Sequence, residues 1–169
     1  MIKIRIALPN DAKKIAEINI KTWRICYKGM LPEELLKNRD ITEERILRIH
    51  QEIQSCDKIY IVAEINGEVV GYCYGGNKRD NDYPFKYEIF AIYVLSEFQN
   101  QGVGKALFDE FKKIINNTSF YLYALKQNIK AHNFYQKQGG KEQPKYERVI
   151  QTKEGIKIEE VLYSFNYTA

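Results

Sequence analysis

The 169-residue sequence has few of the residues that interrupt folded structure, with only 10 glycines and 4 prolines. Such a composition excludes fibrous and low-complexity chains, in which these residues are abundant. The sequence also lacks any run of about 18 apolar residues, the length that a membrane-crossing helix needs. Its first residues alternate apolar and charged side chains instead of forming an apolar signal segment. We therefore expect a globular cytoplasmic protein with no membrane partner.

Cysteine and histidine are scarce as well. The three cysteines, Cys26, Cys56 and Cys73, are odd in number and show no C-x-x-C spacing, and the chain has two histidines. This pattern is typical of free thiols in a reducing compartment. Because the neighbours of these cysteines are apolar or β-forming, we expect all three thiols to be buried, and we expect no bound metal.

Charge of one sign is not concentrated anywhere in the chain. The 26 lysines and arginines exceed the 22 aspartates and glutamates by only four, which gives a net charge of +4. The basic residues are spread along the sequence rather than gathered in the short blocks that mark a nucleic-acid-binding patch. The sequence therefore predicts no nucleic-acid partner.

Apolar periodicity predicts one domain, residues 1–169, with alternating helices and strands. The expected strands are 2–6, 58–65, 68–74, 87–94, 120–125, 146–151 and 156–166. Helices are expected after Asp11, after Asp40 or Thr42, after Gly104 and after Asn128, while residues 33–36 allow a further short turn. Two hairpin turns are predicted, at Asn66-Gly67 and at 153–155.

The strand predicted over 87–94 is apolar along nearly its whole length, which is typical of a strand buried on both faces. Its one carboxylate, Glu88, is therefore conspicuous. The strand is followed by a glycine turn and then by a helical pattern, an arrangement that directs free backbone N–H groups at an anion such as a phosphate. Neither nucleotide motif fits, because a Walker A loop would need glycine at Gln99 and a dinucleotide fingerprint would need glycine at Leu107.

The longer pattern Gln99-x-x-Gly102-x-Gly104 resembles the acetyl-CoA pyrophosphate loop of the GNAT superfamily of N-acetyltransferases. The segment from Glu88 to Val94 is similar to the fourth strand of that superfamily. A second motif is similar to its later helix and reads Asn128-x-x-Ala131-x-x-Phe134-Tyr135-x-Lys137-x-Gly139. The resemblance spans essentially the whole chain, with Gly140 as a departure where the family usually has a large apolar residue. It implies an α/β (mixed α+β) fold with a central mixed, mostly antiparallel sheet of about seven strands, flanked by about four helices.

The resemblance implies acetyl-CoA as co-substrate, lying between the fourth and fifth strands. The glycine loop would hold the pyrophosphate through N–H groups, the strand backbone and Asn128 would bind the pantetheine arm, and Lys105 or Lys137 would offset phosphate charge. The residues that it implies for cofactor binding are Ile92, Tyr93, Val94, Gln99, Asn100, Gln101, Gly102, Val103, Gly104, Lys105, Asn128, Tyr135 and Lys137.

Acyl transfer to an amine requires movement of two protons. An amine with a pKa of about 10.4 is almost wholly protonated at neutral pH, so a base is needed, and Glu88 is the candidate. The alternative for Glu88 is a structural pair with a lysine or arginine. The resemblance implies Tyr135 as the acid that protonates the departing CoA thiolate. Tyr135 could instead be a core aromatic, in which case His132, one helical turn earlier, competes for the acid role.

The acceptor is less well marked in the sequence. The segment from Thr22 to Pro32 resembles small bacterial members of the family, some of which are similar to polyamine or other small-amine acetyltransferases. Trp23 and Tyr27 within it would hold a cationic amine or else pack in the core, with the loop 75–84 and the final hairpin as further contacts. We therefore expect an N-acetyltransferase acting on a primary amine of a small, polyamine-like molecule. A protein or peptide acetyltransferase and a non-catalytic acyl-CoA-binding module are the alternatives, and a homodimer through the final strands is a further expectation from the resemblance.

Overall fold

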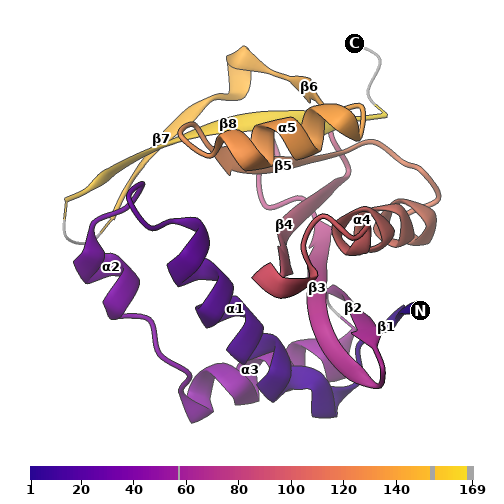
Figure 1. Ribbon diagram of the computed structural model, residues 1–169. Helices are drawn as coiled ribbons and strands as arrows, with labels where there is room; N and C mark the ends of the chain where they lie inside the picture. Colours follow the sequence, from indigo (N-terminus) through magenta and orange to yellow (C-terminus); the bar gives the residue numbers. More distant parts are fainter. Residues whose placement is uncertain (57, 153–154, 167–169) are drawn as a thin grey trace.

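The computed structural model describes residues 1–56, 58–152 and 155–166, and within them the chain forms eight strands and five α-helices (Figure 1). The strands are β1 Ile2–Ile6, β2 Ile59–Ile65, β3 Glu68–Asn77, β4 Tyr87–Val94, β5 Phe120–Leu125, β6 Lys141–Glu142, β7 Arg148–Gln151 and β8 Lys157–Phe165. The helices are α1 Ala12–Cys26, α2 Glu33–Lys37, α3 Glu43–Ser55, α4 Val103–Ile114 and α5 Ile129–Lys137.

All the strands belong to one sheet, in the order β1-β2-β3-β4-β5-β8-β6, with β7 also paired to β8. Among the described strand pairs only β4 and β5 run parallel. The predicted fold class, a mixed and mostly antiparallel sheet flanked by helices, is confirmed. The short helical turn allowed over residues 33–36 is present as α2, and the structure adds the two-residue strand β6, which is too short to produce a periodic pattern in the sequence.

The helices cover the two faces of the sheet. In Figure 1, α1 and α3 lie on one side of β3 and β4, and α4 lies on the other. The first side packs the apolar face of α1 and α3 against Tyr60, Val62 and Tyr72. On the second side Leu107, Phe108 and Phe111 of α4 are fully buried, and side chains of α5 pack against the same core. Segments 100 residues apart are thus brought together around β4.

Local sequence signals account for several element boundaries. Asn66 and Gly67 have φ values of 52° and 81° and form the β2–β3 turn, as a tight hairpin requires. Thr42 caps α3 by accepting a hydrogen bond from the N–H of Arg45 at 3.2 Å. Asn128 caps α5 in the same way, through the N–H of Ala131 at 3.1 Å. These caps follow the predicted helix starts.

The expectation that residues 87–94 are buried on both faces is wrong for the second half of the strand. β4 pairs with β5 only over Tyr87–Ile89, and the two strands then separate. A bulge at Phe90 changes the register of β4 against β3 at the same place. Residues 90–93 are only half-buried because no neighbouring strand covers their outer edge in the described chain.

The expectation of three buried thiols is also corrected. Cys73 in β3 is fully buried, but Cys26 is only partly so and Cys56 is exposed. Cys56 follows the last turn of α3 with a left-handed φ of 57°, so its side chain lies outside the core that the helix covers. The last strands pair as β7 and β8, whereas residues 153 and 154 of the predicted turn lie outside the described residues. None of the helices described here has the length and apolar character to cross a membrane.

Candidate active site

The glycine loop lies between β4 and α4. Gly102, with φ of 87°, immediately precedes the first residue of α4, and Asn100 is also left-handed at 60°. The side-chain amide of Gln99 donates to the carbonyl of Val94 at 2.9 Å and ties the loop to the end of β4. The first-turn N–H groups of a helix have no partner within the helix, and the first turn of α4 holds no acidic residue. The start of α4 can therefore bind an anion.

Two other features of the loop bear on its ligand. A Cβ atom on Gly104 would lie 3.5 Å from the ring of Phe134, which is ordinary contact, so the fold itself does not demand glycine at this position. Lys105, one of the two predicted phosphate partners, forms an ion pair with Asp109 one turn along α4. Lys137, the other, lies exposed in the last turn of α5.

The separation of β4 from β5 exposes backbone at the same end of the sheet. Beyond Ile89 the edge of β4 that faces β5 has no strand partner in the part of the chain described. Ile92, Tyr93 and Val94 lie along this open edge, and the loop follows directly after it. An extended ligand with amide groups could therefore add to β4 as a strand does. Asn128 is nearby in sequence to the end of β5, but its Oδ1 already caps α5.

Tyr135 lies in α5 and is partly buried against the core that α4 covers. Its ring packs against Phe134 at 5.4 Å and Tyr163 at 5.8 Å. Its hydroxyl takes part in no hydrogen bond among the described residues. Burial raises the pKa of Tyr135, with smaller effects from Tyr27, Cys73 and Cys26. The hydroxyl is protonated at neutral pH and free to donate.

Glu88 is 1% exposed, and both of its carboxylate oxygens are occupied. The guanidinium of Arg79 contacts both oxygens in a forked pair, with Nε at 3.0 Å from Oε2. The backbone N–H of Arg79 donates to Oε2 at 3.3 Å, and the hydroxyl of Tyr121 donates to it at 2.9 Å. A buried carboxylate that accepts four hydrogen bonds, two of them from a guanidinium, needs no further partner. These contacts match the structural pair that the sequence left open as the alternative to a catalytic base.

His132 lies on α5 with both ring nitrogens engaged. Nδ1 contacts the hydroxyl of Tyr163 at 2.7 Å, and Nε2 contacts the carbonyls of Leu125 and Lys126, each at 3.1 Å. Because carbonyl oxygens only accept, Nε2 carries a proton. The ring therefore fastens α5 to the end of β5 instead of standing free in the cleft.

The predicted acceptor residues lie on the opposite side of β4 from α4. Trp23 of α1 and Tyr27, the residue directly after that helix, pack edge to face at 4.4 Å, and the hydroxyl of Tyr27 lies 3.4 Å from that of Tyr93. Tyr93 of β4 in turn packs against Tyr72 of β3 at 5.9 Å, so that Tyr27 is joined to the sheet. The structure also places the guanidinium of Arg39 over the Trp23 ring, at 3.6 Å from the ring centre. The face of Trp23 is therefore already occupied by a cation.

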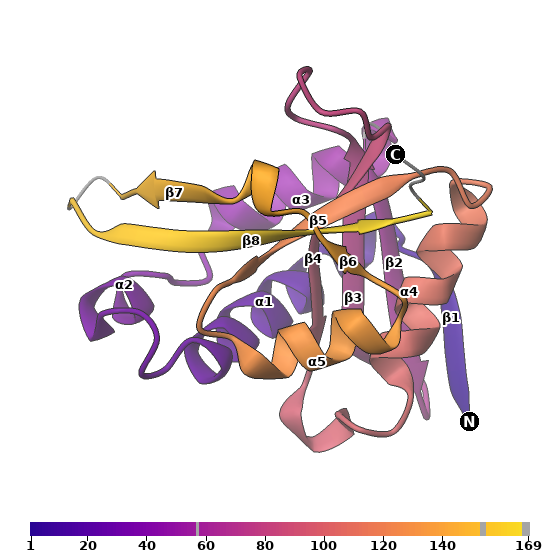
Figure 2. The ribbon, with the colours of Figure 1, turned by 90° about the horizontal axis from the view of Figure 1, so that it is seen from above.

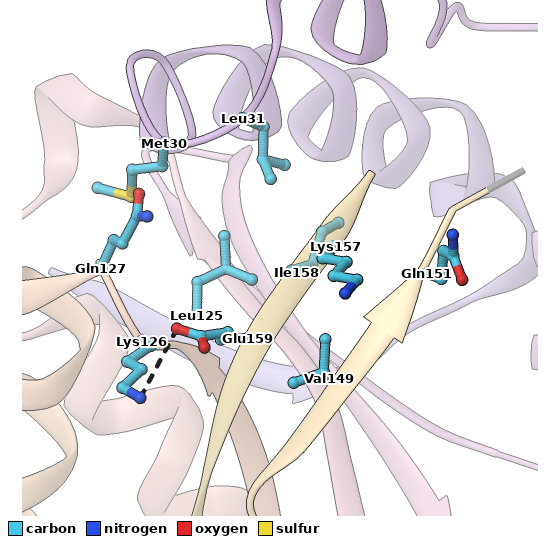
Figure 3. Close-up of a pocket in the computed structure, with 10 residues that line it drawn as sticks. All are labelled: Met30, Leu31, Leu125, Lys126, Gln127, Val149, Gln151, Lys157, Ile158 and Glu159. Atoms are coloured by element: carbon cyan, nitrogen blue, oxygen red, sulfur yellow. Dashed lines mark ion pairs between the residues drawn. The ribbon is translucent and has the colours of Figure 1, made fainter. Parts of the chain in front are cut away.

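A pocket of about 590 Å³ opens beside Met30 and Leu31, in the segment that follows Tyr27 (Figure 3). Its walls come from three places: the segment after α1, the end of β5 and the β7–β8 pair. Figure 2 shows that pair extending from the sheet past α2. The final hairpin thus lines this pocket, whereas the loop 75–84 does not, and neither Trp23 nor Tyr27 is among its lining residues. The residues around it are Met30, Leu31, Leu125, Lys126, Gln127, Val149, Gln151, Lys157, Ile158 and Glu159.

Sequence reasoning missed Arg79 and Tyr121 as the partners of Glu88, and Arg39 as the cation over Trp23. Arg79 lies in a polar loop and Arg39 between two helices, where no periodicity indicates which way a side chain turns. The lone carboxylate in an apolar strand was the one usable signal, since a buried charge requires a partner. No group of three or more histidine, cysteine, aspartate or glutamate side chains in the described chain is arranged to hold a metal ion.

Comparison with known proteins gives a consistent result. A family model described as "Acetyltransferase (GNAT) family" matches residues 18–140. The uncharacterised N-acetyltransferase YuaI of Bacillus subtilis is 28% identical over 131 residues, which cover 76% of this chain and 74% of the relative. The spermidine N(1)-acetyltransferase of Thermoplasma acidophilum is 24% identical over 147 residues, or 83% of this chain and 88% of the relative. The crystal structure of the PaiA N-acetyltransferase of Thermoplasma acidophilum in complex with coenzyme A superposes with a TM-score of 0.76 at 22% identity, and covers 99% of each chain.

Proposed function

The chain belongs to the GNAT family of acetyltransferases, and we propose that it transfers the acetyl group of acetyl-CoA to a primary amine of a small molecule. It is an N-acetyltransferase with acetyl-CoA as its co-substrate. The observation that supports the acceptor side of the proposal is that Tyr27 contacts Tyr93, a residue of β4 beyond the point where β4 and β5 separate. A small amine reaching Tyr27 would lie close to a thioester held along β4.

In the proposed complex the first turn of α4 and the loop from Gln99 to Lys105 bind the pyrophosphate through N–H groups. The pantetheine arm extends along the open edge at Ile92–Val94. The exposed Lys137 lies on the following helix and would neutralise phosphate charge, whereas Lys105 would first have to leave Asp109. Asn128 would contribute its Nδ2 group, because its Oδ1 serves as the helix cap.

The proposed chemistry is direct attack of the neutral amine on the thioester carbonyl. The carbon–nitrogen bond forms, the carbon–sulfur bond breaks, and the thiolate leaves with the bonding electrons. Tyr135 gives its proton to that sulfur and recovers one from solvent, while the amine nitrogen loses its extra proton to solvent. The contacts of Glu88 support the role of anchor for Arg79 and for the loop after β3, since it would have to give up a hydrogen bond before accepting a proton.

Calorimetry and a thiol-release assay test the proposal. We expect the protein to bind acetyl-CoA, to show no comparable binding of ATP or NAD, and to release CoA thiol when a small primary amine is present. Failure to bind acetyl-CoA would refute the proposal. Release with peptides and with no small amine would indicate a peptide acetyltransferase, and binding without release across both panels would indicate a non-catalytic module.

A further inference from the structure

Arg39 lies in the connection between α2 and α3 and turns its side chain into the acceptor side of the site. Its guanidinium stacks over Trp23, whose ring contacts Tyr27. Burial lowers the pKa of Arg39, and Tyr93, Tyr27 and Tyr72 offset part of that effect. The half-buried cation therefore stacks on Trp23, which is linked through Tyr27 to Tyr93 and Tyr72; these four residues form an aromatic cluster.

The backbone around Arg39 is held in place. Arg24, the neighbour of Trp23 on α1, donates from Nη2 to the carbonyl of Arg39 at 2.8 Å and to Oδ1 of Asp40 at 2.9 Å. Its Nε donates to the carbonyl of Leu36 at 3.3 Å. These hydrogen bonds fix the connection against α1. The stack on Trp23 then orients the guanidinium before any ligand arrives, which lowers the entropy cost of binding.

The described residues offer Arg39 no counter-charge. Asp40 pairs with Arg24, Glu88 pairs with Arg79, and Glu52 is shared by Lys58 and Tyr60. No carboxylate lies within ion-pair distance of Arg39 in the described chain, and Arg45 is a like charge close enough to lower its pKa. Buried charges are normally paired, because their desolvation is otherwise uncompensated.

The same place is also short of hydrogen-bond acceptors. The indole N–H of Trp23 is buried with no acceptor among the described residues. The guanidinium of Arg39 can donate five hydrogen bonds in a planar fork that matches a carboxylate or a phosphate. A cationic polyamine would bring further donors and further positive charge to this cluster, while an oxyanion would bring what it lacks.

We infer that Arg39 binds an oxyanion of the acceptor, so that the substrate is an amine carrying a carboxylate or phosphate group and not a polyamine. The inference rests on the proposed function, because it assigns the acceptor of that same transfer. The ring of Tyr27 contacts Trp23, and its hydroxyl lies 3.4 Å from that of Tyr93 in β4. A bound amino acid would therefore direct its oxyanion to Arg39 and its amine past Tyr27 to the thioester along β4.

Matched acceptor pairs test this inference with the full chain. Ornithine and putrescine, lysine and cadaverine, and O-phosphoethanolamine and ethanolamine differ within each pair only by the acidic group, and spermidine is added as a polyamine. We expect kcat/KM in the thiol-release assay to be at least about tenfold higher for the acidic member of a pair. The first two pairs report a carboxylate and the third a phosphate, so the assay also distinguishes the two sources.

Variants assign the effect to Arg39. Arg39→Gln should raise KM for the acidic acceptors at least about tenfold with little change for their partners, and Arg39→Lys should restore part of the loss. Lys37→Gln is the matched control, since it removes one positive charge from the same segment at an exposed side chain paired with Glu33. Acetyl-CoA affinity and melting temperature should be unchanged in all three, which shows that the fold and the co-substrate site are intact.

A binding measurement keeps the inference separate from catalysis. Trp23 is the only tryptophan in the sequence, so its fluorescence reports directly on the group above its ring. Titration with ornithine or O-phosphoethanolamine should change this fluorescence in the wild type and not in Arg39→Gln. Equal or better turnover of putrescine and spermidine would overturn the inference, and so would the absence of any fluorescence change that depends on Arg39. If no amine is acetylated at all, the proposed function fails, and the fluorescence result still decides the role of Arg39.

Discussion

Replacement of Tyr135 by phenylalanine removes one hydroxyl group and retains the ring. The ring contacts with Phe134 and Tyr163 are preserved, and the hydroxyl has no hydrogen-bond partner among the described residues that would be left unsatisfied. We therefore expect the free energy of unfolding to change by less than about 0.5 kcal/mol. Any loss of activity can then be assigned to chemistry and not to folding.

The expected catalytic effect follows from the environment of the hydroxyl. General acid catalysis typically accelerates a reaction about 10²–10⁴-fold. Here burial raises the pKa of Tyr135, and the departing thiolate is only moderately basic, because the pKa of its parent thiol is about 8.5. Both facts reduce the advantage of a positioned proton donor. We expect kcat to fall at least about tenfold, which corresponds to about 1.4 kcal/mol of transition-state stabilisation. The KM for acetyl-CoA should change by less than a factor of about two, because the hydroxyl acts only as the bond to sulfur breaks.

The assay is steady-state thiol release with a saturating amine, repeated from about pH 6 to about pH 10. Because the pKa of Tyr135 is raised above its usual value of 10.0, the wild-type enzyme should show no loss of the acid below about pH 10. Tyr87→Phe is the control, since Tyr87 packs partly buried against the same core at the far end of β4. A Tyr135→Phe enzyme with the turnover of the wild type across this pH range would show that this tyrosine only packs.

Three further predictions follow from the same contacts. Gly104→Asp should weaken acetyl-CoA binding, measured by calorimetry, at least about tenfold, because a carboxylate near the start of a helix repels a phosphate. The same carboxylate interacts favourably with the helix dipole, so stability should not fall. Gly104→Ala should retain acetyl-CoA binding. Arg79→Gln should lower the free energy of unfolding, measured by urea denaturation, by about 2 kcal/mol, since it leaves the Glu88 carboxylate short of hydrogen-bond donors. The double variant with Glu88→Gln should recover more than half of that loss, and additive effects of the two substitutions would contradict this coupling. Gly75→Ala should lower the melting temperature measurably, because the new Cβ would lie 2.7 Å from the Phe111 ring and closer still to the Glu88 carbonyl. An unchanged melting curve would show that β3 shifts freely.

The sequence by itself determined the features that depend on neighbours in the chain. Asn66-Gly67 adopts positive φ because asparagine and glycine tolerate it, so the hairpin was predictable from these two residues. Thr42 and Asn128 cap helices through an N–H three residues on, and Gly102 takes the left-handed conformation that starts α4. The glycine loop and the order of elements are local in the same sense, which is why the fold class and the family were predictable.

Only the tertiary structure decided which side chains contact one another in the site. Whether Glu88 acts as a base or pairs with an arginine depended on where the loop containing Arg79 folds back, and nothing in its local pattern specifies that. The place of Arg39 over Trp23 depends on α2, a helix of five residues, and on the hydrogen bonds of Arg24. The half-exposure of residues 90–93 depends on the separation of β4 from β5, two strands joined through α4. Contacts of this kind arise from packing between distant segments, whereas turns and caps arise from the conformational preferences of a few consecutive residues.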